Sequence, residues 1–293
     1  MILRAVPHWS SLEVSIWELT GGITNRNYLV TVDGQHRVVR IPGERTELLG
    51  INRAHEAEAT RRAADLGISP AVIGELREAG TLITDFVDGA HLEGEAFVGR
   101  LGEVVELVHR FHSSGSLGGA FPIHRVVEWH ARDALAHGVA LPSQFSELHD
   151  VSRQIETAFE KTPEAPVPCH NDLLPANVLF GPHRVWLLDF EYAGMNDRYF
   201  DLGNLSVNCA LDQSGDEAIL RAYFGSVSKQ SIARLQLMKI MSEFREGMWA
   251  VVQQAISTID TDFVAYANER LENCARLAFS PNFERLITDA GSR

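Results

Sequence analysis

The sequence predicts an α+β fold of two lobes, in which a small N-terminal antiparallel sheet with one helix precedes a larger, mainly helical C-terminal lobe. Three observations predict this fold. The first ~90 residues contain short runs typical of strands. From Leu92 onward, helical periodicity dominates. The chain of 293 residues is also too long for one small core and long enough for two lobes. We expect the lobes at residues 1–88 and 89–293, with a cleft at their boundary.

The N-terminal lobe is expected to contain five strands and one helix. The strands are expected at residues 15–19, 28–32, 37–41, 72–75 and 81–86. Asp33-Gly34, between the second and third strands, is typical of a tight hairpin turn. The helix is expected at residues 53–66, where Gly67 and Pro70 then end it.

The C-terminal lobe is expected to be helical, with one interruption. Residues 95–114 and 235–256 show the apolar spacing of long helices. Between these helices, two short strands are expected at residues 178–180 and 185–188, joined by a Gly-Pro turn.

Composition favours a soluble globular protein, with 45% hydrophobic and 22% charged residues. The formal charge of −13 argues against a nucleic-acid partner, which requires a basic surface. No signal peptide is indicated, and no stretch approaches the roughly 18 apolar residues of a membrane span. The three cysteines lack C-x-x-C spacing, and the 12 histidines form no H-x-x-x-H motif, which argues against a metal centre built from them. We therefore expect a reduced, cytoplasmic protein without a membrane partner, and the sequence carries no signal for an oligomeric state.

Oxygen-bearing side chains are concentrated at residues 169–194, between apolar runs. Asp172 and Asn177 are five residues apart on one loop, and Asp189 follows the second short strand. Protein kinases use this order for an Asp near the attacking hydroxyl and for an Asn and an Asp that hold Mg²⁺. Either Asp172 or Asn177 alone would be a turn cap. The ordered set predicts phosphoryl transfer from ATP, with Asp172 at the acceptor hydroxyl and Asn177 and Asp189 binding Mg²⁺.

The same segment resembles the choline/ethanolamine kinase branch of the aminoglycoside-phosphotransferase-like kinases. The matching residues are HND at 170–172, Asn177, LDFEY at 188–192, FDLGN at 200–204, GGITNRNY at 21–28, Arg53 and Glu56 with Gly67 and Pro70, WAVVQ at 249–253, and Tyr266-Ala267. The resemblance covers nearly the whole chain. It implies a protein-kinase-like fold, ATP and Mg²⁺ as cofactors, and a small amino alcohol such as choline or ethanolamine as the acceptor.

A kinase places a cation, usually Lys, on the nucleotide phosphates. This chain has three lysines, and none lies in the N-terminal lobe. It also lacks G-x-x-x-x-G-K-[ST], which excludes a P-loop NTPase. Arg40, on the third expected strand, is therefore the candidate cation, because a guanidinium can fork onto phosphate oxygens. Glu56, on the following helix, is the candidate carboxylate that holds Arg40 in place.

Further nucleotide contacts are expected from two segments. Thr24 and Asn25, next to a Gly-Gly pair, are placed to offer a hydroxyl and backbone N–H groups to the phosphates. The Gly-Gly pair alone is explained equally well by a hairpin turn. Main-chain groups of Asp85 and Val87, at the crossing between lobes, are expected to contact adenine.

Three more residues near the catalytic segment are interpreted from their positions. Glu191 lies two residues beyond Asp189, which puts it on the same face of an extended chain. It is therefore a candidate for a second metal, through water, or for a substrate contact. His170 is interpreted as a support of the loop backbone, and Asp201 either as a support of that loop or as a cap of the next helix.

The acceptor site is predicted from the resemblance, because aromatic faces attract quaternary ammonium groups. Trp249 and Tyr266 fall on positions that line the choline pocket in the family. Two residues depart from that pattern: Glu246 stands where choline kinases have a Trp, and Asn208 where they have a Glu. Glu246 shares a helix face with Trp249, and its carboxylate suits an amine that donates hydrogen bonds better than a methylated one. Choline, ethanolamine and related amino alcohols all remain open.

Two alternative functions are compatible with part of the sequence. A phosphotransferase for an aminoglycoside, thiamine or another metabolite requires several carboxylates around a wide groove, and Glu191, Asp197, Glu243 and Glu246 are available. A nucleotide-binding pseudoenzyme requires a gap in the catalytic set. No such gap is found, because Arg40, Glu56, Asp172, Asn177 and Asp189 are all present.

Overall fold

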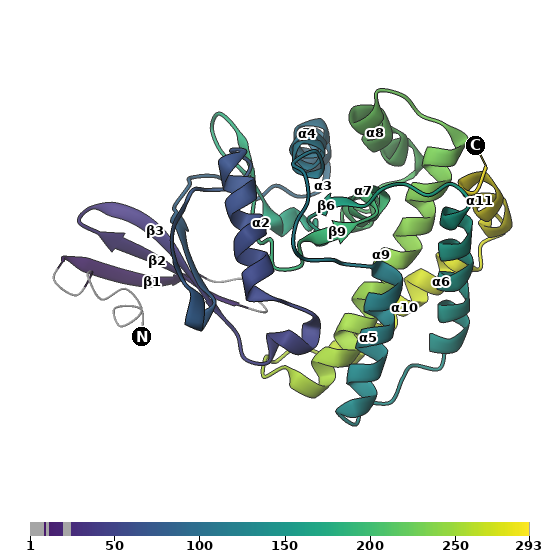
Figure 1. Cartoon of the computed structure of the whole chain (residues 1–293), viewed down its shortest axis with the longest axis horizontal. Coiled ribbons are helices and arrows are strands. Elements are labelled where there is room, and N and C mark those ends of the chain that lie inside the picture. Colours follow the sequence, from purple (N-terminus) through teal and green to yellow (C-terminus); the bar gives the residue numbers. More distant parts are fainter. Residues whose placement is uncertain (1–8, 10–11, 20–24, 293) are drawn as a thin grey trace.

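The N-terminal lobe is an antiparallel sheet with a helix beside it (Figure 1). The structure is a computed structural model, and it describes residues 9, 12–19 and 25–292. The sheet contains β1 (Val14–Leu19), β2 (Asn25–Val32), β3 (Gln35–Pro42), β4 (Val72–Leu76) and β5 (Thr81–Asp85), in the order β1-β2-β3-β5-β4. All five strands were predicted within three residues at either end.

Local residues explain how this lobe folds. The β2–β3 turn has positive φ at Asp33 (48°) and Gly34 (76°), as a tight hairpin requires, so the predicted turn is confirmed. Helix α2 (Arg53–Asp65) begins where the Asn52 side chain accepts hydrogen bonds from two backbone N–H groups. It ends before Gly67, which has a φ of 64°. Short 3₁₀ turns, η2 (Thr46–Leu49) and η3 (Arg77–Ala79), connect these elements.

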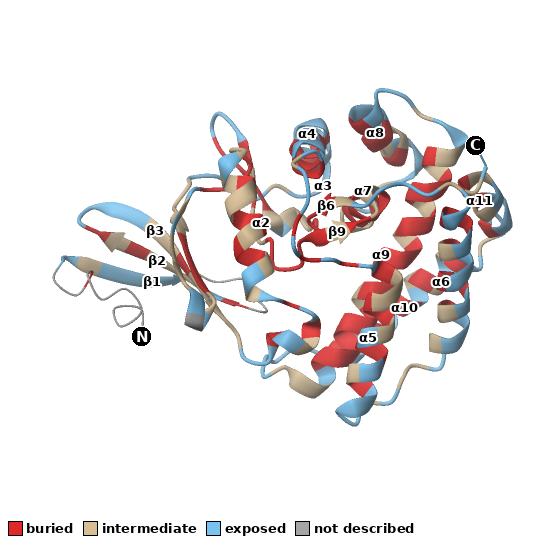
Figure 2. Cartoon of the chain, in the orientation of Figure 1, coloured by how far each residue is buried: buried red, intermediate tan, exposed pale blue. Residues whose placement is uncertain are grey.

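The larger lobe is mainly helical, as predicted. Its helices are α3 (Gly94–Val98), α4 (Leu101–His112), α5 (Ile123–Ala136), α6 (Phe145–Glu160), α7 (Arg198–Asn208), α8 (Gln213–Phe224), α9 (Lys229–Ile256), α10 (Phe263–Ala278) and α11 (Phe283–Ala290). Helix α9 lies at the centre and packs against α5, α7, α10 and α11 (Figure 1). It is therefore buried along most of its length (Figure 2).

Four short strands interrupt the helices. The expected pair, β7 (Val178–Phe180) and β8 (Val185–Leu187), forms an antiparallel ribbon after the 3₁₀ turn η4 (Pro175–Asn177). The second pair, β6 (Val167–Cys169) and β9 (Gly194–Asn196), was not predicted. These two ribbons frame the segment that holds the predicted catalytic residues.

The chain has two apolar cores, and the larger one also includes residues of the N-terminal lobe, such as Leu49, Ala59 and Ile68. The small core of the sheet includes Trp9, Val30, Val39 and Ile83, and a much larger core joins the helices. The lobe boundary at residue 88 stays a prediction. Across the residues that the structure describes, no helix is both long and apolar enough to cross a membrane.

Candidate active site

The loop that carries Asp172 is held by the buried carboxylate of Asp201, on α7. Asp201 is fully buried and accepts hydrogen bonds from the backbone N–H groups of His170 and Asn171, both at 2.7 Å. It also contacts Nε2 of His112 at 2.9 Å. Because hydrogen bonds to a buried carboxylate are strong, the loop has little freedom to move. The predicted support of this loop by Asp201 is confirmed.

Two residues of the site have a left-handed backbone, which is uncommon outside glycine. Both Asn171 and Asp189 have a φ of 64°. The Asn171 side chain fixes its own conformation, because Nδ2 donates to the carbonyl oxygen of Tyr192 at 2.9 Å and Oδ1 accepts from Asn196 at 2.8 Å. The two halves of the site are also joined by His170, whose Nε2 lies 2.8 Å from the carbonyl oxygen of Leu188.

Asp172 and Asn177 lie side by side, as their spacing predicts. Nδ2 of Asn177 donates to the backbone oxygen of Asp172 at 2.9 Å and lies 3.3 Å from its Oδ2. Burial raises the pKa of Asp172 to about 8 against the charge of Arg245, while Glu246, Asp189 and other nearby carboxylates raise it further. Asp172 is therefore in a site where carboxylates converge.

Arg40 is the centre of a buried ionic cluster between β3 and the loop after β8. Nη1 lies 3.0 Å from Oε1 of Glu56, and Nη2 lies 2.5 Å from Oδ1 of Asp189 and 3.1 Å from Oε2 of Glu191. Burial alone would lower the pKa of Arg40, but these carboxylates outweigh burial and raise it. The pairing of Arg40 with Glu56 was predicted. The arrangement brings Arg40 directly to a predicted metal ligand.

Glu191 belongs to the same cluster. Its Oε2 accepts from Nδ2 of Asn25 at 2.8 Å and lies 3.3 Å from Nη1 of Arg53. Arg53 also pairs with Oε2 of Glu56 at 2.6 Å. Glu191 therefore lies beside Arg40 and Arg53. Its role toward a substrate, like that of Asn25 toward phosphates, stays a prediction.

The donor atoms near Asp189 fit a magnesium ion. Nδ2 of Asn177 donates a hydrogen bond to Asp172, so the amide Oδ1 is the atom of this side chain that could bind a metal ion. Oδ1 of Asp189 pairs with Arg40, and Oδ2 is the second carboxylate oxygen that could bind a metal ion. Amide and carboxylate oxygens are the hard ligands that Mg²⁺ takes. Asn177 and Asp189 therefore have the chemistry that the prediction requires.

The structure describes only some of the residues that were predicted to contact adenine and the phosphates. The backbone N–H of Asp85 donates to the carbonyl oxygen of Ala71 at 2.9 Å, and its carboxylate pairs with Arg37. This N–H is therefore not available to adenine, and a contact there needs other groups of the crossing segment, such as those of Val87. Thr24 lies outside the described residues.

The predicted acceptor residues meet on α9 and α10. The Tyr266 hydroxyl donates to Oε1 of Glu246 at 2.9 Å, and burial, followed by the charge of Glu246, raises the pKa of Tyr266. The ring centroids of Trp249 and Tyr266 are 6.4 Å apart at an angle of 74°. Nε1 of Trp249 donates to the hydroxyl of Tyr192 at 2.9 Å. Glu246, Trp249 and Tyr266 therefore form one group, as predicted.

Arg245 connects this group to Asp172. Its Nη1 lies 2.6 Å from Oε2 of Glu246 and 3.4 Å from Oδ1 of Asp172. Its guanidinium carbon lies 4.3 Å from the ring centroid of Tyr192. These contacts form a path from Asp172 through Arg245 and Glu246 to Tyr266.

Comparison with known proteins agrees with this geometry. The family described as "Phosphotransferase enzyme family" matches residues 15–237. The crystal structure of a choline/ethanolamine kinase family protein from Mesorhizobium loti is 30% identical, covers 99% of this chain and 96% of its own, and superimposes with a TM-score of 0.84. The chain belongs to the choline/ethanolamine kinase family of phosphotransferases. Its reaction is phosphoryl transfer to an alcohol group.

Other members are less similar in sequence. Human ethanolamine kinase 2 is 27% identical over 299 residues, which cover 91% of this chain and 77% of that protein. Protein LicA of Haemophilus influenzae is 25% identical over 267 residues, or 88% and 78% of the two chains. The structure of choline kinase LicA from Streptococcus pneumoniae, at 24% identity and a TM-score of 0.79, covers 94% of this chain and 98% of its own and shows the same fold.

Sequence reasoning missed some residues of this kinase-family site. It recognised Arg53 only as part of a motif, and it did not select Arg245 or Tyr192. Arginine in a helix usually indicates a solvated face, so nothing local indicated that Arg245 is 1% exposed. A signal was available for Arg53, because it lies one helical turn before Glu56 and can pair with it.

Asn208, the second departure from the choline kinase pattern, supports the catalytic loop. Its Nδ2 donates to the carbonyl oxygen of Leu173 at 3.2 Å. Two of the four carboxylates considered for a wide acidic groove also have other partners: Asp197 caps α7 through the N–H of Tyr199, and Glu243 pairs with Arg270.

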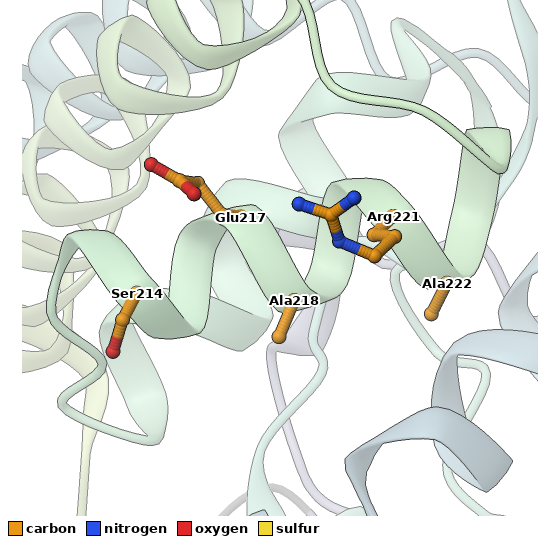
Figure 3. Close-up of a pocket in the computed structure, with 5 residues that line it drawn as sticks. All are labelled: Ser214, Glu217, Ala218, Arg221 and Ala222. Carbon is orange, nitrogen blue, oxygen red and sulfur yellow. The ribbon is translucent and has the colours of Figure 1, made fainter.

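Two cavities in the described part of the chain lie away from the candidate active site. One of about 420 Å³ runs along α8 and is lined by Ser214, Glu217, Ala218, Arg221 and Ala222 (Figure 3). Another of about 250 Å³ lies near the start of α5 and the end of α6. Neither is lined by Asp172, Arg40 or Trp249, so neither belongs to the candidate site.

Proposed function

We propose that this kinase transfers the γ-phosphoryl group of ATP, with Mg²⁺, to the hydroxyl of a small amino alcohol, choline or ethanolamine. The observation that carries the proposal is the contact of Asp172 with both Asn177 and Arg245. Through these two contacts, Asp172 lies between the candidate metal ligands and the candidate acceptor residues. A residue that handles an acceptor hydroxyl must lie there.

The donor side of the reaction is assigned to the arginine cluster. Arg40 is charged and held by Glu56, so it is oriented before the nucleotide binds. Its guanidinium is suited to phosphate oxygens, and the contact with Asp189 keeps it beside the metal ligands. Asn177 and Asp189 would hold Mg²⁺, which would neutralise negative charge on the phosphates.

The acceptor side is assigned to Asp172 and the residues of α9 and α10. Asp172 accepts the hydrogen bond of the substrate hydroxyl and aligns its oxygen for attack. The loop around Asp172 is fixed by Asp201, so this alignment needs little reorganisation. Glu246 supplies negative charge for the amine of the acceptor.

A small acceptor is favoured over an aminoglycoside. Glu243 and Asp197 are engaged within the protein. Glu191 pairs with Arg40 and Arg53 and accepts a hydrogen bond from Asn25. Glu246 is the carboxylate of these four that accepts the hydrogen bond of the Tyr266 hydroxyl. One carboxylate beside two aromatic rings suits one ammonium group rather than several.

The test is phosphorus NMR of the purified protein with Mg-ATP and single acceptors. Ethanolamine and choline are the expected acceptors, with thiamine and an aminoglycoside as the alternatives. We expect a new phosphomonoester signal with an amino alcohol and none when Asp172 is replaced by Asn. Formation of a phosphomonoester only with thiamine or the aminoglycoside would reject the proposed acceptor class. Failure with every acceptor would reject the proposed function.

A further inference from the structure

Arg245 is a fully buried arginine, and among the described residues its hydrogen-bond and ionic contacts all involve one nitrogen. Nη1 contacts Oε2 of Glu246 and Oδ1 of Asp172. Nε and Nη2 are buried and have no hydrogen-bond partner within the described part of the chain. A buried charge without its counter-ions is strongly disfavoured. Arg245 therefore depends on these two carboxylates and stays close to them.

The guanidinium also covers an aromatic face. Its carbon lies 4.3 Å from the ring centroid of Tyr192 and 5.9 Å from that of Phe121. Both distances are within the range of a cation–π contact. Tyr192 is itself 5% exposed, so little of its ring is left for another cation.

Arg245 thus contacts a carboxylate and an aromatic face, the two kinds of group that would stabilise a cationic substrate. A trimethylammonium group is stabilised mainly by aromatic faces, because it has no N–H to donate. A primary ammonium has three N–H donors and is stabilised mainly by acceptor oxygens. Arg245 takes the face of Tyr192. It takes only part of Glu246, whose two carboxylate oxygens each receive one donor here and have lone pairs for more.

We propose that Arg245 determines acceptor specificity, selecting an alcohol with a primary ammonium and rejecting one with a trimethylammonium. This inference rests on the proposed function. The charge of Arg245 repels both ammonium groups similarly, so repulsion does not distinguish them. The distinction arises because Glu246 can still accept hydrogen bonds from a primary ammonium, whereas the face of Tyr192 is already covered by Arg245 and cannot stabilise a trimethylammonium.

The first experiment measures the ratio of kcat/KM for ethanolamine to that for choline. We expect a ratio well above one for the unaltered protein. In Arg245→Met the ratio should fall by about tenfold or more, because the freed face of Tyr192 offers a cation–π contact worth about that factor in affinity. Arg245→Lys is the matched control. It keeps the charge beside Glu246, and its ratio should stay nearer that of the unaltered protein.

A second variant guards against a folding defect in Arg245→Met, which leaves Glu246 without its cation. The double variant Arg245→Met with Glu246→Gln removes the pair as a whole. Its kcat/KM for ethanolamine should fall, and its ratio of kcat/KM for ethanolamine to that for choline should stay as low as in Arg245→Met. Adding Tyr192→Leu to Arg245→Met should abolish that gain, because the gain requires the aromatic face.

A binding measurement separates recognition from chemistry. Tetramethylammonium has no hydroxyl and can only compete with the acceptor. It should inhibit ethanolamine phosphorylation by Arg245→Met at a concentration about tenfold lower than for the unaltered protein. Methylammonium should show no such improvement.

The outcomes are distinct. Equal loss of both activities in Arg245→Met, with the ratio unchanged, means that Arg245 has only a structural role and overturns the inference. A preference of the unaltered protein for choline also overturns it, while the proposed function stands. If the unaltered protein phosphorylates neither acceptor, the proposed function fails, and the inference that depends on it fails as well.

Discussion

Asn177 donates a hydrogen bond from its side-chain Nδ2 to the backbone oxygen of Asp172, at 2.9 Å, and faces the Asp172 carboxylate at 3.3 Å. The nitrogen of this amide orients the residue assigned to the acceptor hydroxyl, and its oxygen is the proposed ligand for Mg²⁺. The five-residue spacing has a physical reason, because the 3₁₀ turn Pro175–Asn177 folds the chain back onto Asp172.

Asp172→Asn tests the role of this carboxylate. The substitution preserves size and the contact with Asn177 but removes the group that accepts the hydroxyl proton. We expect kcat to fall by about 10²–10⁴-fold, the usual contribution of such a group. Calorimetric titration with Mg-ATP should give a dissociation constant close to that of the unaltered protein. A loss of less than tenfold in kcat would exclude the assigned role.

Arg40→Ala tests the nucleotide side. Hydrogen bonds from a charged group contribute about 1.5–3 kcal/mol, so the dissociation constant for Mg-ATP should rise by roughly 10–100-fold. The matched control is Arg132→Ala, which removes the same charge from helix α5 of the other lobe. Arg132 is 68% exposed and pairs with Asp133, so its loss should leave nucleotide affinity nearly unchanged. Equal effects of the two variants would contradict the assignment.

Asp201→Ala should destabilise the catalytic loop and the fold. The loss leaves two backbone N–H groups and His112 without their buried acceptor. We expect the free energy of unfolding, measured with urea, to fall by about 3–5 kcal/mol. Asp150→Ala removes a carboxylate that is 56% exposed and pairs with an exposed arginine, so it should cost less than about 1 kcal/mol. Similar losses in the two variants would show that Asp201 is not a structural centre.

His130 should make stability depend on pH. Burial, followed by the charge of Arg245, lowers the pKa of His130 to about 3 in the folded protein. The unfolded chain binds this proton at a pKa of about 6.5. The contribution of neutral His130 to stability is therefore complete above pH 6.5 and is lost as the pH falls from 6.5 toward 3.

His130→Leu should remove this pH dependence. Between pH 6 and 5, its free energy of unfolding should fall less steeply than that of the unaltered protein, by up to about 1.4 kcal/mol per pH unit. Above pH 7 the two proteins should show parallel curves, which serves as the internal control. Parallel curves at pH 5 as well would mean that His130 is not kept neutral in the folded state.

The fold was predictable where local signals were strong. The hairpin at Asp33-Gly34, the alternating strands and the capped helix α2 each depend on neighbouring residues. The pairing of β6 with β9 was missed because both strands have only three residues, and one contains Pro168. Their pairing depends on residues that are almost 30 positions apart, and a local pattern cannot indicate it.

The site was predictable where chemistry imposes spacing. Asp172, Asn177 and Asp189 were selected because a loop and a hairpin fix their separations. The contact of Asn177 with Asp172 agrees with the spacing, and the roles of the three residues stay predictions. Arg245 was missed because its role depends on the burial of α9 between several helices, which is a property of the assembled lobe.

A crystal structure with Mg²⁺, a non-hydrolysable ATP analogue and ethanolamine would show whether Asp172, Asn177 and Asp189 bind the acceptor hydroxyl and the metal ion together. We expect the ion to bind Oδ1 of Asn177 and a carboxylate oxygen of Asp189, with the acceptor hydroxyl hydrogen-bonded to Asp172. An ion or nucleotide bound away from Asn177 and Asp189, or a hydroxyl that does not reach Asp172, would contradict the account.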